Sequence, residues 1–434
     1  MKPTLSPGFL ATAFLAPIFL ASAALAQDRA GADRLMQAYQ DRVLTESTSS
    51  LKTDDHISMY QTLVKAQPDV LHYQNLLAGA YIQKVRETVD FSYLERAHQV
   101  LQNVLAQDPK NYEAQRLRTE IALERHDFHA AAQYSETLTQ QAPNDSWNWG
   151  TLGDAQTELG NYDKAAEAYQ KMMNIRPDLS SYNRAAYFRF LYGDVENGTK
   201  IMKMAIAAGS PMKENTAWCE VELGKMYLKT GKLKEAEDAF SSGLRNFANY
   251  HPALSGLAQV QASKHDWKSA IANMKRAQAS VPMPDYAAAL YDYYTALGDT
   301  KEAKKQKEMI EVIDQVGQAA QEKANRNIAI IFADHNWNPG RALELAQNEL
   351  EVRGDVYTYD ALAWALFKNK KYAEASEAMK KATRLGTPEP AFYYHAGMIE
   401  NSLGHKDEAR ELLKKALELN PAFDQASATL KELS

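Results

Sequence analysis

Two histidines three positions apart are the first residues of this sequence that could do chemistry. His126 and His129 lie in the run Arg125-His126-Asp127-Phe128-His129, and imidazole nitrogens are common zinc ligands. We expect this run to form the turn between two helices, and no acidic third ligand follows it at metal spacing. The sequence therefore favours a solvated turn over a metal site.

Two other groups could act as an acid, a base or a nucleophile. Asp334 and His335 are adjacent, but we expect them at the end of a helix, where charged groups interact with the helix dipole. Cys219 follows Trp218 on an amphipathic stretch. A catalytic thiol needs a lowered pKa and a nearby base, and the sequence indicates neither. We interpret Cys219 as a buried apolar residue.

The familiar catalytic motifs are missing from the sequence. It contains no glycine-rich phosphate loop, no Gly-x-Ser-x-Gly elbow and no His-Glu-x-x-His helix. The lysine-rich stretches 301–307 and 368–371 have acidic residues nearby, which is typical of solvated faces. We therefore predict that the protein is not an enzyme and needs no metal or cofactor.

Composition narrows the possible partners. The 434 residues include 49 Lys and Arg against 55 Asp and Glu, for a net charge of −6. Nucleic-acid binding depends on basic residues that meet phosphates, so we expect no nucleic-acid partner. The single cysteine excludes an intramolecular disulfide, and stability must come from packing.

The first residues have the pattern of a secretory signal. Lys2 precedes an apolar stretch at 9–25, which ends in the small-residue sequence 24–26. A membrane anchor is the alternative, but Pro17 interrupts the stretch, which falls short of the roughly 20 apolar residues of a span. We expect cleavage before Gln27, a periplasmic or secreted protein, and no stable membrane insertion afterwards.

A regular spacing of aromatic and small residues indicates paired helices. In the window Ser146–Pro177, Gly153 allows two helices to approach, Gly160 ends the first helix, and Pro177 begins the next unit. A small residue recurs with most intervals within one residue of 34, at Ala97, Ala131, Ala165, Gly198, Ala236, Ala270, Ala303, Ala342, Ala375 and Ala409.

On these residues the chain resembles the tetratricopeptide repeat family over roughly 56–421. Glycines such as Gly160 and Gly404 lie five residues before the recurring position, and prolines such as Pro177 and Pro421 lie twelve after it. The resemblance implies an all-α fold, an α-solenoid that forms a right-handed superhelix of about ten tandem helix-turn-helix repeats.

The repeat limits divide the chain into four parts. We predict a signal peptide at 1–26, a flexible lead at 27–55, the solenoid at 56–421 and a terminal capping helix at 422–434. A charged run at 301–307 precedes a lengthened repeat, and we expect it to belong to an elongated helix that ends near Asn325.

In the family, the first helix of each repeat lines the inner wall of the superhelix. Large rings and single polar groups at those positions suit a peptide-binding groove. The predicted partner-binding residues of this inner wall are Trp147, Asp154, Asn183, Tyr187, Trp218, Lys225, Asp292, Asn327, Tyr357, Asp360, Trp364 and Tyr394. The alternative is that these rings pack between adjacent repeats.

The sequence suggests two functions of different classes. The first is a scaffold or adaptor of the cell envelope that binds a segment of a protein partner along the inner wall. The second is a carbohydrate-binding envelope protein, since exposed Trp and Tyr rings also stack on sugars. The partner's identity and the oligomeric state stay open, because function lies in the site rather than the fold.

Overall fold

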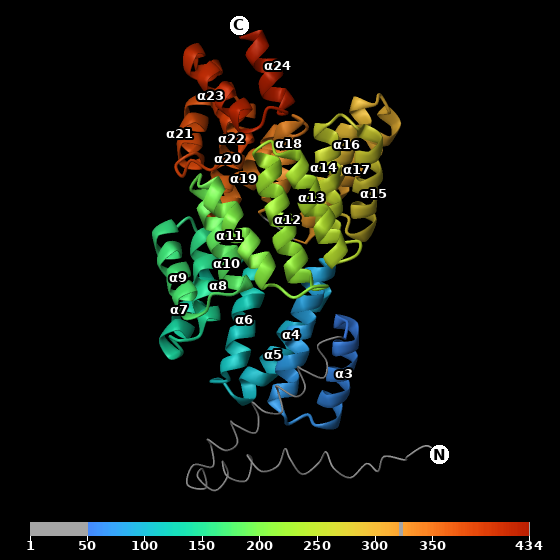
Figure 1. Ribbon diagram of the computed structural model, residues 1–434, viewed down its shortest axis with the longest axis vertical. Coiled ribbons are helices and arrows are strands. Elements are labelled where there is room, and N and C mark those ends of the chain that lie inside the picture. The colour runs from blue at the N-terminus through green and yellow to red at the C-terminus, as the bar shows by residue number, and fades with distance from the viewer. Residues whose placement is uncertain (1–50, 321–323, 434) are drawn as a thin grey trace, which may run out of the picture. The chain divides into compact units, whose positions relative to one another are not determined.

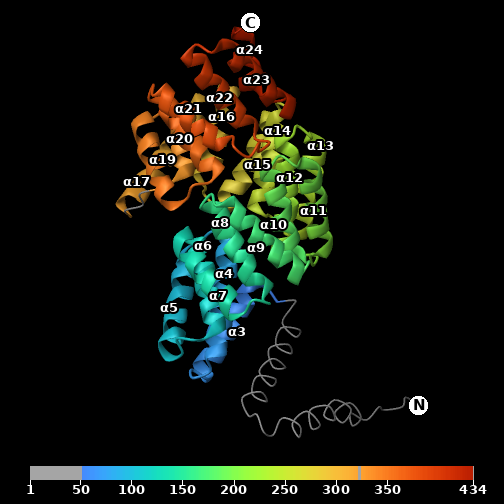
Figure 2. The ribbon, with the colours of Figure 1, turned by 90° about the vertical axis from the view of Figure 1, so that its left-hand side faces the viewer.

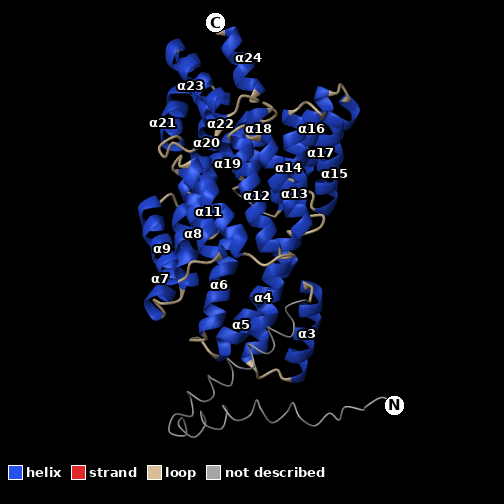
Figure 3. Ribbon diagram, viewed as in Figure 1, coloured by secondary structure: helices blue, strands red, loops and turns tan. Residues whose placement is uncertain are grey.

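A computed structural model of the protein describes residues 51–320 and 324–433. Within these ranges every regular element is a helix and no strand is present (Figure 3), which confirms the all-α class. The predicted signal peptide and nearly all of the predicted lead lie outside the described residues. The chain divides into two compact units, Met1–Ala80 and Tyr81–Ser434.

The first unit contains α3 (Thr53–Ala66) and the beginning of α4 (Leu71–Thr88). Helix α3 buries Ile57 and Tyr60, three positions apart and therefore on one face of the helix. It begins three residues before the start of the predicted solenoid at 56.

The second unit is a row of helices in consecutive packed pairs, an α-solenoid as predicted (Figure 1). Its helices after α4 are α5 (Ser92–Gln107), α6 (Tyr112–Glu124), α7 (Phe128–Gln141), α8 (Ser146–Glu158), α9 (Tyr162–Ile175), α10 (Leu179–Leu191), α11 (Val195–Ala208), α12 (Glu214–Lys229), α13 (Leu233–Asn246), α14 (His251–Ser263), α15 (Trp267–Ser280), α16 (Pro284–Ala296), α17 (Thr300–Ala319), α18 (Arg326–Asp334), α19 (Pro339–Val352), α20 (Val356–Lys368), α21 (Tyr372–Ala382), α22 (Pro390–Leu403), α23 (Lys406–Leu419) and α24 (Asp424–Glu432).

The turns between the two helices of a pair share one backbone conformation. A residue with left-handed φ ends the first helix, and glycine takes this position at the lowest cost. Gly160 has φ of +75° between α8 and α9, whereas His126 has φ of +58° between α6 and α7. Asp127 then caps α7 by accepting the Ala130 N–H at 3.1 Å. His126 thus lies in a turn, as predicted.

The recurring small residues lie where two helices touch. Ala165 is fully buried on α9. A Cβ atom on Gly153 of α8 would lie 2.3 Å from the Tyr169 ring of α9, so only glycine fits there. The prediction that Gly153 permits close approach is confirmed.

The second unit closes on itself along a seam between its earlier and its later helices (Figure 2). We define the seam as the contacts of three turns with three loops. The turns are α8–α9, α10–α11 and α12–α13, and the loops are α19–α20, α21–α22 and α23–α24. At the first contact, the Gly354 N–H donates to the Glu158 carbonyl at 3.0 Å. The Val356 N–H donates to the Tyr162 hydroxyl at 3.0 Å. Groups some 190 residues apart in sequence are therefore in direct contact.

The other two contacts of the seam repeat this pattern. The Thr387 hydroxyl donates to the Leu191 carbonyl at 2.7 Å, and the Asn420 amide donates to the Leu228 carbonyl at 3.3 Å. An apolar cluster that includes Tyr162, Leu191, Val356 and Phe392 fills the space beside these bonds. The seam thus combines hydrogen bonds with buried apolar area.

Helix α17 is shorter than the sequence suggested. It ends at Ala319 rather than near Asn325. Asn325 instead caps the next helix, because its side-chain oxygen accepts the Ile328 N–H at 3.0 Å. At the C-terminus, α24 buries Ala426. Among the described residues, no helix has the length and apolar character that crossing a membrane requires.

Candidate functional site

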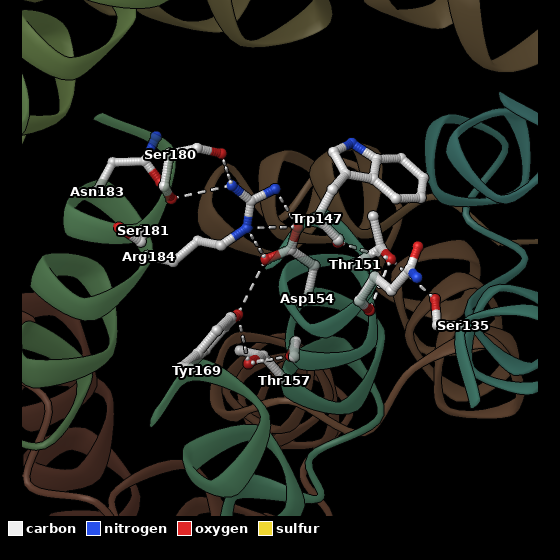
Figure 4. Close-up of polar contacts among 12 residues, drawn as sticks. Ser135, Trp147, Thr151, Asp154, Thr157, Tyr169, Ser180, Ser181, Asn183 and Arg184 are labelled. Atoms are coloured by element: carbon white, nitrogen blue, oxygen red, sulfur yellow. Dashed lines mark hydrogen bonds and ion pairs between the residues drawn. The ribbon is translucent and has the colours of Figure 1, made fainter. Parts of the chain in front are cut away.

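The inner-wall residues of α8 and α10 bind other residues of the chain. Asp154 receives three charge-assisted bonds from Arg184, at 2.8 Å from Nε to Oδ1, 2.9 Å from Nε to Oδ2 and 2.7 Å from Nη2 to Oδ2. The Tyr169 hydroxyl donates to the same carboxylate at 3.0 Å. Figure 4 shows Arg184 held between Asp154 and Ser180. Such a bidentate pair is among the strongest polar contacts in proteins, so Asp154 ties two repeats together.

The three neighbouring predicted residues are also in contact with adjacent repeats. The Trp147 ring lies 4.5 Å from the guanidinium of Arg116 on α6. The Asn183 amide is 3.9 Å from the Cys219 sulfur. Tyr187 packs against the apolar cluster of the seam, and burial raises the pKa of its hydroxyl. These residues have structural contacts, as in the alternative that the rings pack between repeats.

Cys219 is buried at one of these contacts. Burial raises the pKa of its thiol to about 12. A thiol in that state is a poor nucleophile at neutral pH, which agrees with the sequence-based interpretation of Cys219 as an apolar residue.

Predicted residues farther along the chain form pairs across neighbouring helices. Trp218 packs against the cluster around Phe240. Asp292 accepts from the His335 ring, with 2.9 Å between Oδ1 and Nε2. The Asn327 amide donates to Asp285 at 3.2 Å. Of these, Asp292 and Asn327 are exposed.

The last four predicted residues belong to α20 and α22. Trp364 is only 2% exposed, donates from its indole N–H to Asp334 at 2.7 Å, and stacks on the His395 ring. Asp360 is buried and lies 2.8 Å from His395. A buried ring offers no area to a partner, so Trp364 does not belong to an accessible inner wall.

The remaining two residues lie closer to the surface. The Tyr357 hydroxyl accepts a hydrogen bond from Lys229 at 3.1 Å. The Tyr394 ring is half-buried and lies 5.7 Å from the ring of Phe423. Both residues therefore contact side chains of the cleft described below, but do not line it themselves.

One cleft of about 390 Å³ lies between the two sides of the seam, a volume within the range of ligand pockets. Of the predicted residues, only Lys225 lines it. The complete lining is Lys225, Leu228 and Lys229 of α12, Gln259 and Ser263 of α14, Tyr293 of α16, and Glu389, Pro390, Asn420 and Phe423 of the C-terminal side. We call these ten residues the cleft.

The two lysines of the cleft have different surroundings. Lys229 donates to Tyr357 and pairs with Glu389 at 2.6 Å. Burial lowers its pKa, but Glu389 and Tyr357 together outweigh burial, and the net shift of the Lys229 pKa is upward. Lys225 pairs at 2.7 Å with Glu222 one turn away on the same helix, and its side chain is 50% exposed. Lys229 is thus a structural cation, whereas Lys225 is accessible.

The cleft also has a hydroxyl and an apolar wall. Tyr293 is 6% exposed, and the described part of the chain contains no hydrogen-bond partner for its hydroxyl. The hydroxyl oxygen is not fully buried, and Tyr293 lines the cleft. Burial raises the pKa of Tyr293, which keeps the hydroxyl protonated and able to donate. Leu228, Pro390 and Phe423 supply the apolar surface.

Sequence reasoning missed most of this lining. Lys229 lies one helical turn beyond Lys225 and could have been found by extending the inner face of α12. Glu389, Asn420 and Phe423 could not, because they reach the cleft only through closure of the seam.

A different cluster has the spacing of a metal site. Within the described ranges, donor atoms of Glu400, His405 and Glu408 lie within 4.8 Å of one another. Glu400 is already bonded to His405 at 2.7 Å and to Ser376 at 2.8 Å. His405 and Glu408 are exposed and Glu400 is already bonded, so we assign no metal to them.

Comparison with known proteins supports the repeat assignment. Two family models, both described as tetratricopeptide repeat, match the sequence. One covers residues 122–186, and the other covers residues 89–146 and 361–424. No curated protein matches the sequence.

Solved structures with similar folds include three helical-repeat neighbours. The type IV pilus biogenesis factor PilW is 17% identical with a TM-score of 0.41, over 46% of this chain and 92% of its own. Yeast Tom70 is 13% identical with a TM-score of 0.39, over 92% and 96%. Human IFIT1, solved as a dimer with PPP-AAAA, is 12% identical with a TM-score of 0.46, over 84% and 95%.

Proposed function

We propose that this protein is an interaction scaffold of the cell envelope, whose cleft holds a short segment of a protein partner. The observation that carries the proposal is the contrast within the inner wall. Asp154, Asp360 and Trp364 are bonded inside the protein, whereas Lys225 lines the cleft with a half-exposed side chain. A partner that fills the cleft gains polar contacts without displacing a structural bond.

The tetratricopeptide repeats support this class of function, since stacked repeats present extended surfaces for macromolecules. The size of the cleft limits how much of a partner it can hold. A volume of about 390 Å³ suits one or two anchoring side chains rather than a whole domain. Anchors of that kind carry most of the binding energy in protein interfaces.

A recovery experiment with matched variants tests the proposal. The wild-type protein, Lys225→Glu, Phe423→Ala and the control Lys301→Glu are each used to recover partners from extracts of the cells that make the protein. Lys301 is exposed on α17 and lies outside the cleft. We expect one partner to be kept by wild type and Lys301→Glu and lost by both cleft variants. Equal recovery by all four proteins would refute the scaffold role of the cleft.

The same proteins distinguish the carbohydrate alternative. Sugar binding to a glycan array that is lost in Phe423→Ala, with no protein recovered from extracts, would replace the peptide proposal.

Export is a separate part of the proposal and rests on the sequence pattern of residues 1–26. Mass spectrometry of the protein from its native cells should give Gln27 as the first residue, in the periplasmic or secreted fraction. A chain that still begins at Met1 would contradict export by a cleaved signal.

A further inference from the structure

We infer that the second unit opens and closes at the seam, and that the cleft exists only in the closed state. The inference rests on the proposed function, because it gives a means of regulating the same cleft. Closing retains a bound segment, and opening releases it.

Three consecutive turns are shaped for this closure. Gly160, Gly193 and Gly231 end the first helices of their pairs with φ of +75°, +79° and +69°. A Cβ atom on each of them would clash with the opposite side of the seam. The atoms that it would meet are the Gly354 carbonyl oxygen at 2.3 Å, the Gly386 carbonyl oxygen at 2.9 Å and Cδ of Pro421 at 2.9 Å. The three glycines therefore let the C-terminal loops approach the turns.

Other turns with a left-handed φ lack this close approach. Gly298 of the α16–α17 turn has φ of +76°, but a Cβ atom there would touch no other part of the described chain within 4 Å. The α6–α7 and α14–α15 turns flank the three seam turns, and they carry His126 and His265 at the same position, each with φ of +58°. The turn itself thus accepts a side chain. The glycines of the seam serve the contact between its two sides.

The seam can separate without unfolding a repeat. Among the described residues, close helix packing joins helices no more than two places apart in the chain, whereas the seam joins turns to loops. In a solenoid each repeat is stabilised by its immediate neighbours. Loss of the seam therefore leaves the packing of every helical pair in place.

Several contacts favour the closed state. Glu158 pairs with Arg353 at 3.1 Å across the first contact, and Lys229 pairs with Glu389 at 2.6 Å across the third. Opening also exposes the apolar cluster around Tyr162 to water, which costs free energy. The closed state therefore predominates, and the open state is the minor one.

The cleft depends on this closure because its two walls come from opposite sides of the seam. Glu389, Asn420 and Phe423 belong to the C-terminal side, whereas Lys225 and Tyr293 belong to α12 and α16. Separation of the sides removes one wall. The apparent affinity for a segment that touches both walls then falls with the fraction of closed protein.

Hydrogen exchange of the full protein tests the opening with two matched variants. Gly160→Ala and Gly298→Ala carry the same cost of a left-handed φ, but only Gly160→Ala places a methyl group against the seam. The Gly354 and Val356 amides donate across the seam. We expect them to exchange about tenfold faster in Gly160→Ala than in Gly298→Ala, while the interior amides of α9 and α20 stay equally protected. Gly193→Ala, with its milder contact, replaces Gly160→Ala if that variant does not fold.

The outcomes separate this inference from the proposed function. Equal exchange of the seam amides in the two variants, or seam amides as protected in the wild type as the interior of α9, overturns the opening. Faster exchange in Gly160→Ala with partner recovery equal to that of Gly298→Ala overturns the coupling of the seam to the cleft. The scaffold proposal fails on different evidence, namely recovery that ignores Lys225 and Phe423. Because exchange is measured on the protein alone, that failure leaves the opening of the seam supported.

Discussion

Helices α8 and α12 occupy equivalent places in their repeats, yet their inner faces differ in chemistry. On α8, Asp154 is held by Arg184 and Tyr169 from the next two helices. On α12, Lys225 occupies the same repeat position and meets only Glu222 on its own helix. The difference teaches that an inner-wall position stays accessible only where the neighbouring repeats do not bond to it.

The largest effect should come from Trp364, a predicted groove residue that the fold buries. Trp364→Ala should lower the free energy of unfolding by about 3–5 kcal/mol, because it removes a buried ring and its bond to Asp334. Urea unfolding measures the change. Met204→Ala, at an exposed position of α11, is the control and should stay near wild type. A loss below about 1 kcal/mol would mean that Trp364 is not a core residue.

The second effect tests Asp154, the inner-wall residue that is bonded within the protein. Asp154→Asn keeps the shape of the side chain but leaves the Arg184 guanidinium without its counter-charge. Because both side chains are partly exposed, we expect a loss of about 2–3 kcal/mol, less than for a fully buried pair. The exposed Asp238→Asn on α13 controls for the charge change. Equal stability of the two variants would show that the pair contributes nothing.

The third effect is a pH dependence at α14. Burial, followed by the charge of Lys225, lowers the pKa of His251 to about 4, and its Nδ1 lies 2.8 Å from the Tyr286 hydroxyl. The folded protein thus binds fewer protons than the unfolded chain between pH 6.5 and 4. His251 therefore costs stability as the pH falls through that window, about 2 kcal/mol between pH 7 and 5.

His251→Gln should remove that loss. Urea unfolding of wild type and variant at both pH values measures the difference, and the contributions of all other groups cancel in the comparison. An identical pH dependence of the two proteins would contradict the buried, neutral state of His251.

The fourth effect concerns the seam, which brings the two sides of the cleft together. Thr387→Val removes the donor to the Leu191 carbonyl and should ease local opening by about 1–2 kcal/mol. Hydrogen exchange at the Gly354 and Val356 amides, which both donate across the seam, should then quicken about tenfold. Thr137→Val, exposed on α7, is the control. Unchanged exchange at both amides would show that the three seam contacts open independently.

The smallest effect concerns Lys225, the inner-wall residue that stays accessible. Lys225→Met should change the free energy of unfolding by no more than about 0.5 kcal/mol, since the Lys225 side chain is half exposed and its partner Glu222 lies on the same helix. The same variant should lose the partner. A large loss of stability would place Lys225 among the structural residues with Asp154.

The sequence predicted the repeat unit well because its determinants are local. Gly153 must be small since the Tyr169 ring lies against it, and Gly160 adopts a left-handed φ that glycine favours. The inner wall was harder to predict. The family pattern placed Trp364 and Asp360 on it, but partners from α18 and α22 bury both. The sequence pattern gives the direction of a side chain from its own helix, and the packing of other helices decides its exposure.

By itself, the sequence determined that this protein is a series of helical pairs, because each pair is encoded by residues within about 34 positions. Only the tertiary structure decided which inner residues face a cleft. The seam brings Glu389 and Phe423 to Lys225 across more than 160 residues of chain. That closure depends on the summed rotation between successive repeats, which no single repeat contains.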